Sequence, residues 1–172
     1  TENWKRPKRE IDTLMLLLRT YLKQAESMFH ENRVRFEFIG DVEPLSDAMK
    51  DALQGLRLRT ARHSKTTLIL AINYSGQQDI AQAAKRLQLA SETITCDSIE
   101  QSLQTSAYGP VDLLLRTGGE NRISNFFLWQ SAYAEIHFLE KYWPDFKPDD
   151  LEDEVRRFAV SERRFGGLSK TS

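Results

Sequence analysis

The sequence predicts an α/β fold, a single domain with a central mostly parallel β-sheet flanked by helices. Segments with helical periodicity alternate with short strand-like segments along the 172 residues. Two of the strand-like segments are apolar throughout, which is typical of parallel strands that helices cover on both faces. A chain of this length suits one domain, because it can bury roughly 70% of the surface of its unfolded form.

Helices are expected where apolar residues recur at steps of three and four. The longest spans residues 10–32, with Leu14 and Leu18 on its apolar face. Asp97 and Glu100 lie three residues apart and resemble a capping box, which indicates a helix start. The remaining helices are expected over residues 45–64, 79–89 and 148–164.

Strands are expected in four places. Residues 33–39 alternate between apolar and charged side chains, as a strand with one buried face does. Residues 68–72 and 111–115 are almost continuously apolar, so we expect both to be buried on two faces. The stretch that follows Glu135 also becomes apolar and strand-like.

Charge and cysteine content exclude several classes of protein. Lys and Arg number 24 and Asp and Glu 25, so the net charge is −1 and lacks the basic excess of a dedicated nucleic-acid binder. The single cysteine, Cys96, cannot form an internal disulfide or a thiolate zinc site, which fits the cytoplasm.

The longest apolar run, residues 14–18, is far shorter than the roughly 20 residues of a membrane-spanning helix. Residues 1–6 resemble no signal or transit peptide and lack an initiator Met, so we expect the chain to begin inside a larger protein.

A candidate anion site follows the second apolar strand. Arg116 comes directly after that strand, and the glycines at 118–119 allow a sharp turn. Arg122 adds a second guanidinium, and Ser124 stands where a helix could start at Asn125. Two arginines and a helix N-terminus suit a multiply charged anion, most naturally a diphosphate. A glycine turn with two surface arginines paired to nearby carboxylates would give the same pattern, and both interpretations stay open on these grounds.

Glu135 is a second candidate because it lies in a stretch that becomes apolar. A carboxylate in such surroundings must be paired, protonated or bound to a metal. Mg²⁺ takes one or two carboxylates together with phosphate oxygens of the substrate. A salt bridge with Arg116 or Arg122 is the simpler alternative, and the residues themselves slightly favour it.

Two further groups of residues carry weaker signals. Residues 2–7 combine an aromatic ring, an amide and cations ahead of a helix, which fits a phosphate-contacting loop or a solvated basic loop equally well. His30, His63 and His137 have no metal-ligand spacing, so we expect each to be structural or exposed.

Together these motifs resemble those of the cis-prenyltransferases, with the bacterial undecaprenyl diphosphate synthases as the nearest members. Residues 116–126 match the signature segment of the family, and residues 2–7 match the loop that leads into its long helix. Further segments match family landmarks in the expected order, and the resemblance covers essentially the whole chain. They are residues 39–41, 73–74, 128–130, 133–135, 143–146 and 162–167.

The resemblance implies a Mg²⁺-dependent enzyme. Such enzymes add isopentenyl diphosphate repeatedly to farnesyl diphosphate with new cis double bonds, giving undecaprenyl diphosphate, the lipid carrier precursor for cell-wall synthesis. The resemblance also implies a homodimer and no nucleic-acid partner. The homodimer is expected in the cytoplasm or at the inner face of the membrane, into which the product partitions. The alternatives are a non-catalytic subunit of a heteromeric prenyltransferase, and an unrelated diphosphate-binding α/β module.

The resemblance also assigns roles to residues of the anion site. It implies that Arg116, Arg122 and Ser124 hold the diphosphate of isopentenyl diphosphate, in agreement with the anion site inferred from the residues. It implies that Glu135 helps to bind Mg²⁺, which reverses the preference for a salt bridge.

The two ends of the chain match further functional segments of the family. The resemblance implies that Asn3 is catalytic and that Trp4 and Arg6 bind substrate from a mobile loop. Arg164 and Gly166 match an Arg-x-Gly motif that reaches across the homodimer to the isopentenyl diphosphate site of the partner.

The sequence departs from the family pattern in two places. The family has an Asp-Gly-Asn-x-Arg-Trp loop upstream of the position of Thr1, which holds the allylic diphosphate and the main Mg²⁺ carboxylate. Nothing here matches it, so we expect residues 1–172 to be the C-terminal portion of one catalytic domain and to be inactive alone. Residues 75–77 read Ser-Gly-Gln where the family usually has Gly-Gly-Arg.

Overall fold

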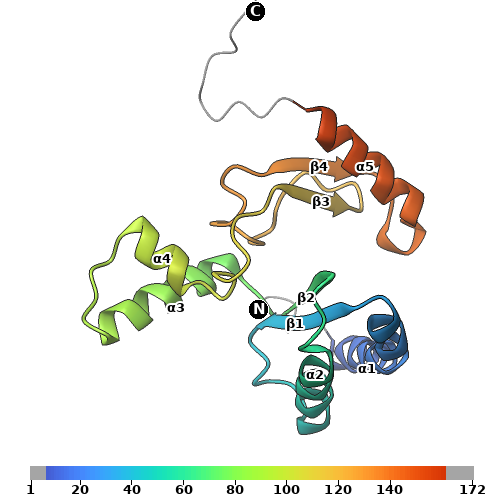
Figure 1. The fold of residues 1–172 in the computed structure, drawn as a ribbon, viewed down its shortest axis with the longest axis horizontal. Helices are drawn as coiled ribbons and strands as arrows, with labels where there is room; N and C mark the ends of the chain where they lie inside the picture. Colours follow the sequence, from blue (N-terminus) through green and yellow to red (C-terminus); the bar gives the residue numbers. More distant parts are fainter. Residues whose placement is uncertain (1–6, 162–172) are drawn as a thin grey trace, which may run out of the picture. The chain divides into compact units, whose positions relative to one another are not determined.

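The computed structural model describes residues 7–161 and confirms the α/β class, because helices alternate with parallel strands (Figure 1). None of the helices it describes is long and apolar enough to cross a membrane. In chain order the elements are α1 (Lys8–Glu31), β1 (Val34–Gly40), α2 (Asp47–Thr60), β2 (Thr66–Ile72), α3 (Gly76–Leu89), α4 (Cys96–Ser102), β3 (Leu113–Thr117), β4 (Glu135–Leu139), the short 3-10 helix η2 (Trp143–Asp145) and α5 (Pro148–Val160).

The chain divides into two compact units, Thr1–Asp79 and Ile80–Ser172. We expected one central sheet, but the strands of the described part form two separate pairs, β1–β2 and β3–β4. Both pairs are parallel. The class of fold is therefore confirmed, whereas a single continuous sheet is not present among the described strands, because no hydrogen-bonded ladder joins the two pairs.

The first unit is built around a core between α1, α2 and the β1–β2 pair. The spacing predicted for α1 is observed in its second half, where Leu22, Ala25 and Phe29 are buried on one face. In its first half Leu18 is only partly buried and Leu14 is 46% exposed, so the predicted apolar face is not covered there. The Phe29 ring stacks on Phe36 of β1 with 6.0 Å between ring centroids. The other buried members of this core are Leu45, Met49, Leu53, Leu56 and Ile72.

β2 differs from the expectation of a strand buried on both faces. Its first three residues are exposed, and they include Leu68, the first residue of the apolar run, which is 38% exposed. The reason is that β2 pairs only with β1 in the part of the chain that the structure describes, and its core contacts are made by Leu70 and Ile72 in its carboxyl-terminal half. β3 is likewise only partly covered, with Leu114 as its buried residue.

Gly40 ends β1 in a conformation that other residues rarely adopt, with φ of +102°. A Cβ atom there would lie 1.9 Å from the carbonyl oxygen of Ile72. We expect Gly40→Ala to lower the free energy of unfolding by about 3 kcal/mol, because the strained φ and the overlap act together. Gly109 has φ of +74° and no heavy atom within 4 Å of a Cβ, so Gly109→Ala, the control, should cost about 1 kcal/mol. Urea unfolding measures both, and equal losses would contradict a role for the close approach.

An ion pair joins α1 to α2. The guanidinium of Arg59 donates to both carboxylate oxygens of Glu26, with 2.9 Å between Nη2 and Oε2. This hydrogen bonding lowers the pKa of Glu26 below its ordinary value of 4.5, and partial burial opposes the shift. Because the folded-state pKa is depressed, the stabilisation is complete above pH 4.5 and is lost as the pH falls through the folded-state value.

We therefore expect Glu26→Gln to reduce the free energy of unfolding by about 0.5 kcal/mol at neutral pH, and by nothing measurable at about pH 2. The effect is small because the side chains of Arg59 and Glu26 are 51% and 30% exposed. Urea unfolding at the two pH values measures it, with Glu31→Gln on the same helix as the control. A loss of equal size at both pH values would show that the ion pair is not its source.

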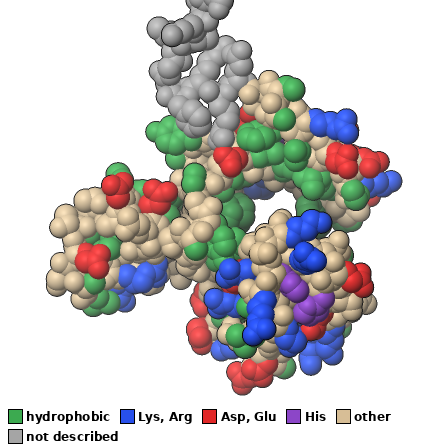
Figure 2. All heavy atoms as spheres, viewed as in Figure 1, with side chains coloured by type: hydrophobic (Ala, Val, Ile, Leu, Met, Phe, Trp, Pro, Cys, Tyr) green, Lys and Arg blue, Asp and Glu red, His purple; other side chains and the backbone are tan. Residues whose placement is uncertain are grey.

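Two of the predicted structural histidines meet at the ends of α1 and α2. His63 Nε2 lies 2.9 Å from Nδ1 of His30, and the rings are arranged edge to face. Figure 2 shows histidine side chains bordered by Lys and Arg side chains on the visible face of this unit. The expectation of structural or exposed positions is confirmed for this pair.

The second unit contains the β3–β4 pair, α4 and α5. Leu113 pairs with Glu135 at the amino ends of the strands, and Thr117 pairs with Leu139 at their carboxyl ends. A helix does start near Asp97, as predicted, but its capping box is not formed by Asp97 and Glu100. Thr95 and Ser98 form the capping box of α4, since each backbone N–H donates to the hydroxyl of the other residue.

α4 packs against α3 through a small apolar core, to which Trp129 also contributes. The predicted last helix ends earlier than expected, at Val160, with Ser161 as its C-cap residue. The later residues of that prediction lie outside the described part of the chain.

Candidate functional site: an arginine–serine pair and a separate carboxylate network

The structure brings together Arg116 and Ser124. Arg116 is the fourth of five residues of β3, and its Nη1 donates a hydrogen bond of 2.9 Å to Oγ of Ser124. A guanidinium has five N–H donors, so several remain for a ligand. The Ser124 oxygen accepts from Arg116, which leaves its own O–H free to rotate towards an anion. The pair therefore offers a fixed positive charge and a hydroxyl donor at the carboxyl end of a parallel strand, where α/β folds bind ligands.

The glycine turn after β3 is present as predicted. Gly118 and Gly119 have φ of +97° and +71°, the left-handed region that glycine allows. Their amides are used inside the protein, because Gly118 N–H donates to the carbonyl of Lys141 and Gly119 N–H to that of Leu139, each at 2.9 Å. The turn therefore positions Arg116 and the following loop, and these amides do not form a phosphate cradle.

The helix predicted to start at Asn125 is not formed. Ser124 and Asn125 have φ of +47° and +63°, and Phe127 has φ of +46°. These left-handed values are incompatible with a right-handed helix, so turns and bends run from Ser124 to Tyr133 instead. The anion site consequently depends on side chains and not on a helix N-terminus.

Arg122 is a surface arginine paired with a nearby carboxylate, as the alternative interpretation of the glycine turn predicted. Its Nη1 forms an ion pair with Glu120, and the two side chains are 63% and 46% exposed. This loop pair lies near Arg116 in sequence, but the hydrogen bond that the structure gives to Ser124 comes from Arg116. The predicted group of two arginines and a serine is thus brought together in part.

Glu135 lies apart from the arginines. In the register of the pair it stands opposite Leu113, three residues before Arg116, which corresponds to about 10 Å along the strand. Side chains alternate between the two faces of a sheet, so Glu135 projects from the face opposite to that of Arg116. The alternative of a salt bridge with Arg116 or Arg122 is therefore wrong, since Arg122 pairs with Glu120 and Glu135 has other partners.

A buried histidine and a hydroxyl bind the Glu135 carboxylate. His137 Nε2 lies 2.7 Å from Oε1, and the Ser161 hydroxyl donates to Oε2. The hydrogen bond from Ser161 contributes most to lowering the pKa of Glu135, followed by that from His137, and a slight desolvation opposes them. The other ring nitrogen of His137, Nδ1, lies 2.6 Å from Oε2 of Glu154 in α5.

This environment fits a hard cation at Glu135. The carboxylate is held ionised, 28% of the side chain is exposed, and each oxygen retains a lone pair beside its hydrogen bond. Within residues 7–161 no three His, Cys, Asp or Glu side chains are grouped closely enough to hold a metal ion alone. An ion bound at Glu135 would therefore need further ligands, and phosphate oxygens are the usual ones for Mg²⁺.

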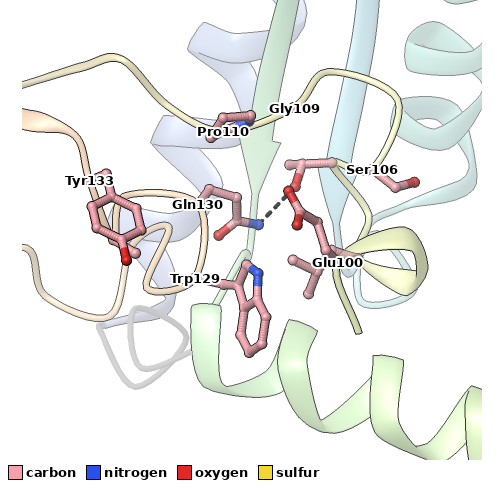
Figure 3. Close-up of a pocket in the computed structure, with 10 residues that line it drawn as sticks. Glu100, Ser106, Gly109, Pro110, Trp129, Gln130 and Tyr133 are labelled. Atoms are coloured by element: carbon pink, nitrogen blue, oxygen red, sulfur yellow. Dashed lines mark hydrogen bonds between the residues drawn. The ribbon is translucent and has the colours of Figure 1, made fainter. Parts of the chain in front are cut away.

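A separate cavity of about 140 Å³ lies in the same unit (Figure 3). Trp129, Gln130 and Tyr133 line it together with Glu100, and Gln130 Nε2 donates to Thr105 at 2.8 Å. Among the described lining residues there is one carboxylate and no Lys or Arg, so the cavity does not suit a diphosphate. Trp129 and Gln130, in the family-matching segment 128–130, thus serve packing and hydrogen bonding beside α4.

The remaining predicted site residues lie outside the described part of the chain. These are Asn3, Trp4 and Arg6 in the N-terminal segment, and Arg164 and Gly166 in the C-terminal segment.

Sequence reasoning missed the partners of Glu135. The two-residue step from Glu135 to His137 predicts that both face one side of a strand, which the structure shows. Nothing in the sequence indicated that Glu154 of α5 would contact His137, or that Ser161 at the end of this helix would contact Glu135.

The parallel strands, with an arginine and a serine at one carboxyl end, define the class as an α/β protein suited to a phosphorylated ligand. Comparison with known proteins then identifies the family. The family model described as "Putative undecaprenyl diphosphate synthase" matches residues 1–166. The chain therefore belongs to the undecaprenyl diphosphate synthase family of cis-prenyltransferases, and it is a prenyltransferase.

Individual proteins agree with this assignment. The isoprenyl transferase of Wolinella succinogenes is 40% identical over 168 residues, which cover 98% of this chain and 74% of that protein. The ditrans,polycis-undecaprenyl-diphosphate synthase of Pseudomonas syringae pv. tomato, named as specific for (2E,6E)-farnesyl diphosphate, is 41% identical over 99% of this chain and 70% of its own length. The crystal structure of lavandulyl diphosphate synthase from Lavandula x intermedia, in complex with dimethylallyl diphosphate, has a TM-score of 0.91 at 32% identity and covers 96% of this chain and 75% of that one.

Proposed function

We propose that the protein elongates a cis-prenyl chain by repeated condensation of isopentenyl diphosphate with farnesyl diphosphate, giving undecaprenyl diphosphate. The observation that carries the proposal is the hydrogen-bonded Arg116–Ser124 pair at the carboxyl end of β3. The printed specificity of the Pseudomonas relative for farnesyl diphosphate supports the choice of the allylic substrate. The product would supply the lipid carrier for cell-wall synthesis.

In the proposed reaction the allylic diphosphate departs from its carbon, the double bond of isopentenyl diphosphate attacks that carbon, and a proton is then lost. Arg116 and Ser124 hold the diphosphate of isopentenyl diphosphate, which fixes the position of the attacking double bond. Mg²⁺, bound through Glu135 and phosphate oxygens, would neutralise diphosphate charge.

We further propose a homodimer in the cytoplasm that releases its product into the inner face of the membrane. Arg164 of one subunit would reach the isopentenyl diphosphate site of the other. Arg164→Ala should then raise KM for isopentenyl diphosphate about tenfold and leave KM for farnesyl diphosphate nearly unchanged. Steady-state kinetics on protein of verified dimeric state measures this, and Arg156→Ala on the exposed side of α5 is the control. Equal changes in both KM values would contradict it.

The function is tested by incubating the purified full-length protein, with any segment upstream of Thr1 included, with labelled isopentenyl diphosphate, farnesyl diphosphate and Mg²⁺. The expected products form a ladder in five-carbon steps that ends at 55 carbons. Binding of isopentenyl diphosphate without turnover would indicate a non-catalytic subunit instead. No binding of either diphosphate would overturn the proposal.

A further inference from the structure

His137 is the most deeply buried ionisable side chain of the β4–α5 region, with 3% of its side chain exposed. It lies between two carboxylates of different elements. Nε2 is 2.7 Å from Glu135 of β4, and Nδ1 is 2.6 Å from Glu154 of α5. The ring thus joins the strand that carries Glu135 to the helix beside it.

Burial is what makes this arrangement specific. A buried imidazole needs partners for its nitrogens, and here both partners are carboxylates. Glu154 is itself held by the guanidinium of Arg157, with Nη1 3.7 Å from Oε2. The chain of contacts therefore runs from Arg157 through Glu154 and His137 to Glu135, and its middle is excluded from water.

The Glu135 carboxylate is fixed on its second oxygen as well. Ser161, the C-cap residue of α5, donates to Oε2, while its backbone N–H donates to the carbonyl of Phe158. Two fixed donors leave the carboxylate one orientation, whereas a free glutamate on a strand end would sample several rotamers. The Glu135 side chain is therefore already ordered before a ligand binds.

We propose that His137 is a positioning residue, which holds the Glu135 carboxylate between strand β4 and helix α5 in the orientation that a divalent cation requires. Ser161 completes the same clamp from the end of α5. The inference rests on the proposed role of Glu135 in the enzyme. It assigns a function to a histidine that the sequence alone left as structural or exposed.

Two substitutions at His137 distinguish the contributions of the two ring nitrogens. The amide nitrogen of glutamine reaches the position of Nε2, so His137→Gln keeps a donor for Glu135 and loses the one facing Glu154. The amide nitrogen of asparagine reaches the position of Nδ1, so His137→Asn keeps the contact to Glu154 and loses that to Glu135. Both remove a buried ring, so a purely structural role predicts similar effects of the two.

The readout is the affinity for Mn²⁺ in the presence of isopentenyl diphosphate, measured by electron paramagnetic resonance on the whole protein. Loss of a group that orients a metal ligand typically weakens metal binding 10–100-fold. We expect that range for His137→Asn, and less than about threefold for His137→Gln. His63→Asn, at the other histidine pair, should leave the affinity unchanged. The free energy of unfolding is measured for each variant.

Ser161→Ala provides a second test that leaves the buried ring intact. It removes the donor to Oε2 and should weaken Mn²⁺ binding about tenfold without loss of folding. Equal Mn²⁺ affinities for His137→Asn and His137→Gln would overturn the proposal. Glu135→Gln distinguishes the metal-binding role of Glu135 from the positioning role of His137. If Glu135→Gln abolishes Mn²⁺ binding while His137→Asn does not weaken it, the positioning role is wrong and the metal-binding role stands. If Glu135→Gln leaves Mn²⁺ binding unchanged, both fall.

Discussion

Replacing Arg116 by alanine should lower kcat/KM for isopentenyl diphosphate about 10³-fold, equivalent to about 4 kcal/mol of lost transition-state binding. Arg116 supplies the positive charge at the carboxyl end of β3, and its hydrogen bond of 2.9 Å to Ser124 fixes the guanidinium. Arg116→Lys keeps the charge but loses the planar set of donors that matches phosphate oxygens, so a loss of about 10²-fold is expected. Steady-state kinetics with varied isopentenyl diphosphate measures both.

Two variants in the same loop give the controls. Arg122 already pairs with Glu120 and is more exposed, so Arg122→Ala should reduce kcat/KM only about tenfold. Ser124→Ala removes one donor to the anion and the partner of Arg116, and should also cost about tenfold. A smaller loss for Arg116→Ala than for Arg122→Ala would contradict the assignment of Arg116 as the main anion-binding group.

The sequence predicted the elements well because their signals are local. The three- and four-residue spacing of Leu22, Ala25 and Phe29 suffices to define the buried face of α1. The arginine at the end of β3 could be found in the same way, because strand ends of parallel sheets are where ligands bind. These features depend on residues that are close in the chain.

The predictions that failed depend on contacts between distant residues or on backbone angles. The alternation around Glu135 shows which residues share a face, but not that this face lies opposite to that of Arg116. That fact follows from the pairing of β3 with β4. The helix expected at Asn125 fails because three residues nearby take positive φ, which composition does not reveal. Nor could the sequence show that Ser161, 26 residues further along, binds Glu135.

Glu135→Ala should lower kcat about 10²-fold at saturating substrates and raise the Mg²⁺ concentration needed for half-maximal rate. The Glu135 carboxylate is held ionised, because hydrogen bonds from Ser161 and His137 lower its pKa. Glu135→Gln is nearly isosteric but neutral, so it should behave like the alanine variant if charge is what matters. Mg²⁺ titrations of the initial rate measure this, and Glu152→Ala on exposed α5 is the control. An unchanged Mg²⁺ requirement in Glu135→Gln would contradict the role.

The position of Glu135 allows a sharper form of this prediction. Glu135 and Arg116 project from opposite faces of the β3–β4 pair and lie three residues apart in register. In the proposed homodimer we therefore expect Glu135 of one subunit to serve the diphosphate that Arg116 of the other subunit binds. In a mixed dimer of Glu135→Ala and Arg116→Ala subunits, both lesions would then fall in one composite site and leave the other site intact. We expect roughly half of the wild-type activity to return in verified heterodimers, although each homodimer is nearly inactive. If Glu135 serves the Arg116 of its own chain, each site carries one lesion and no activity returns.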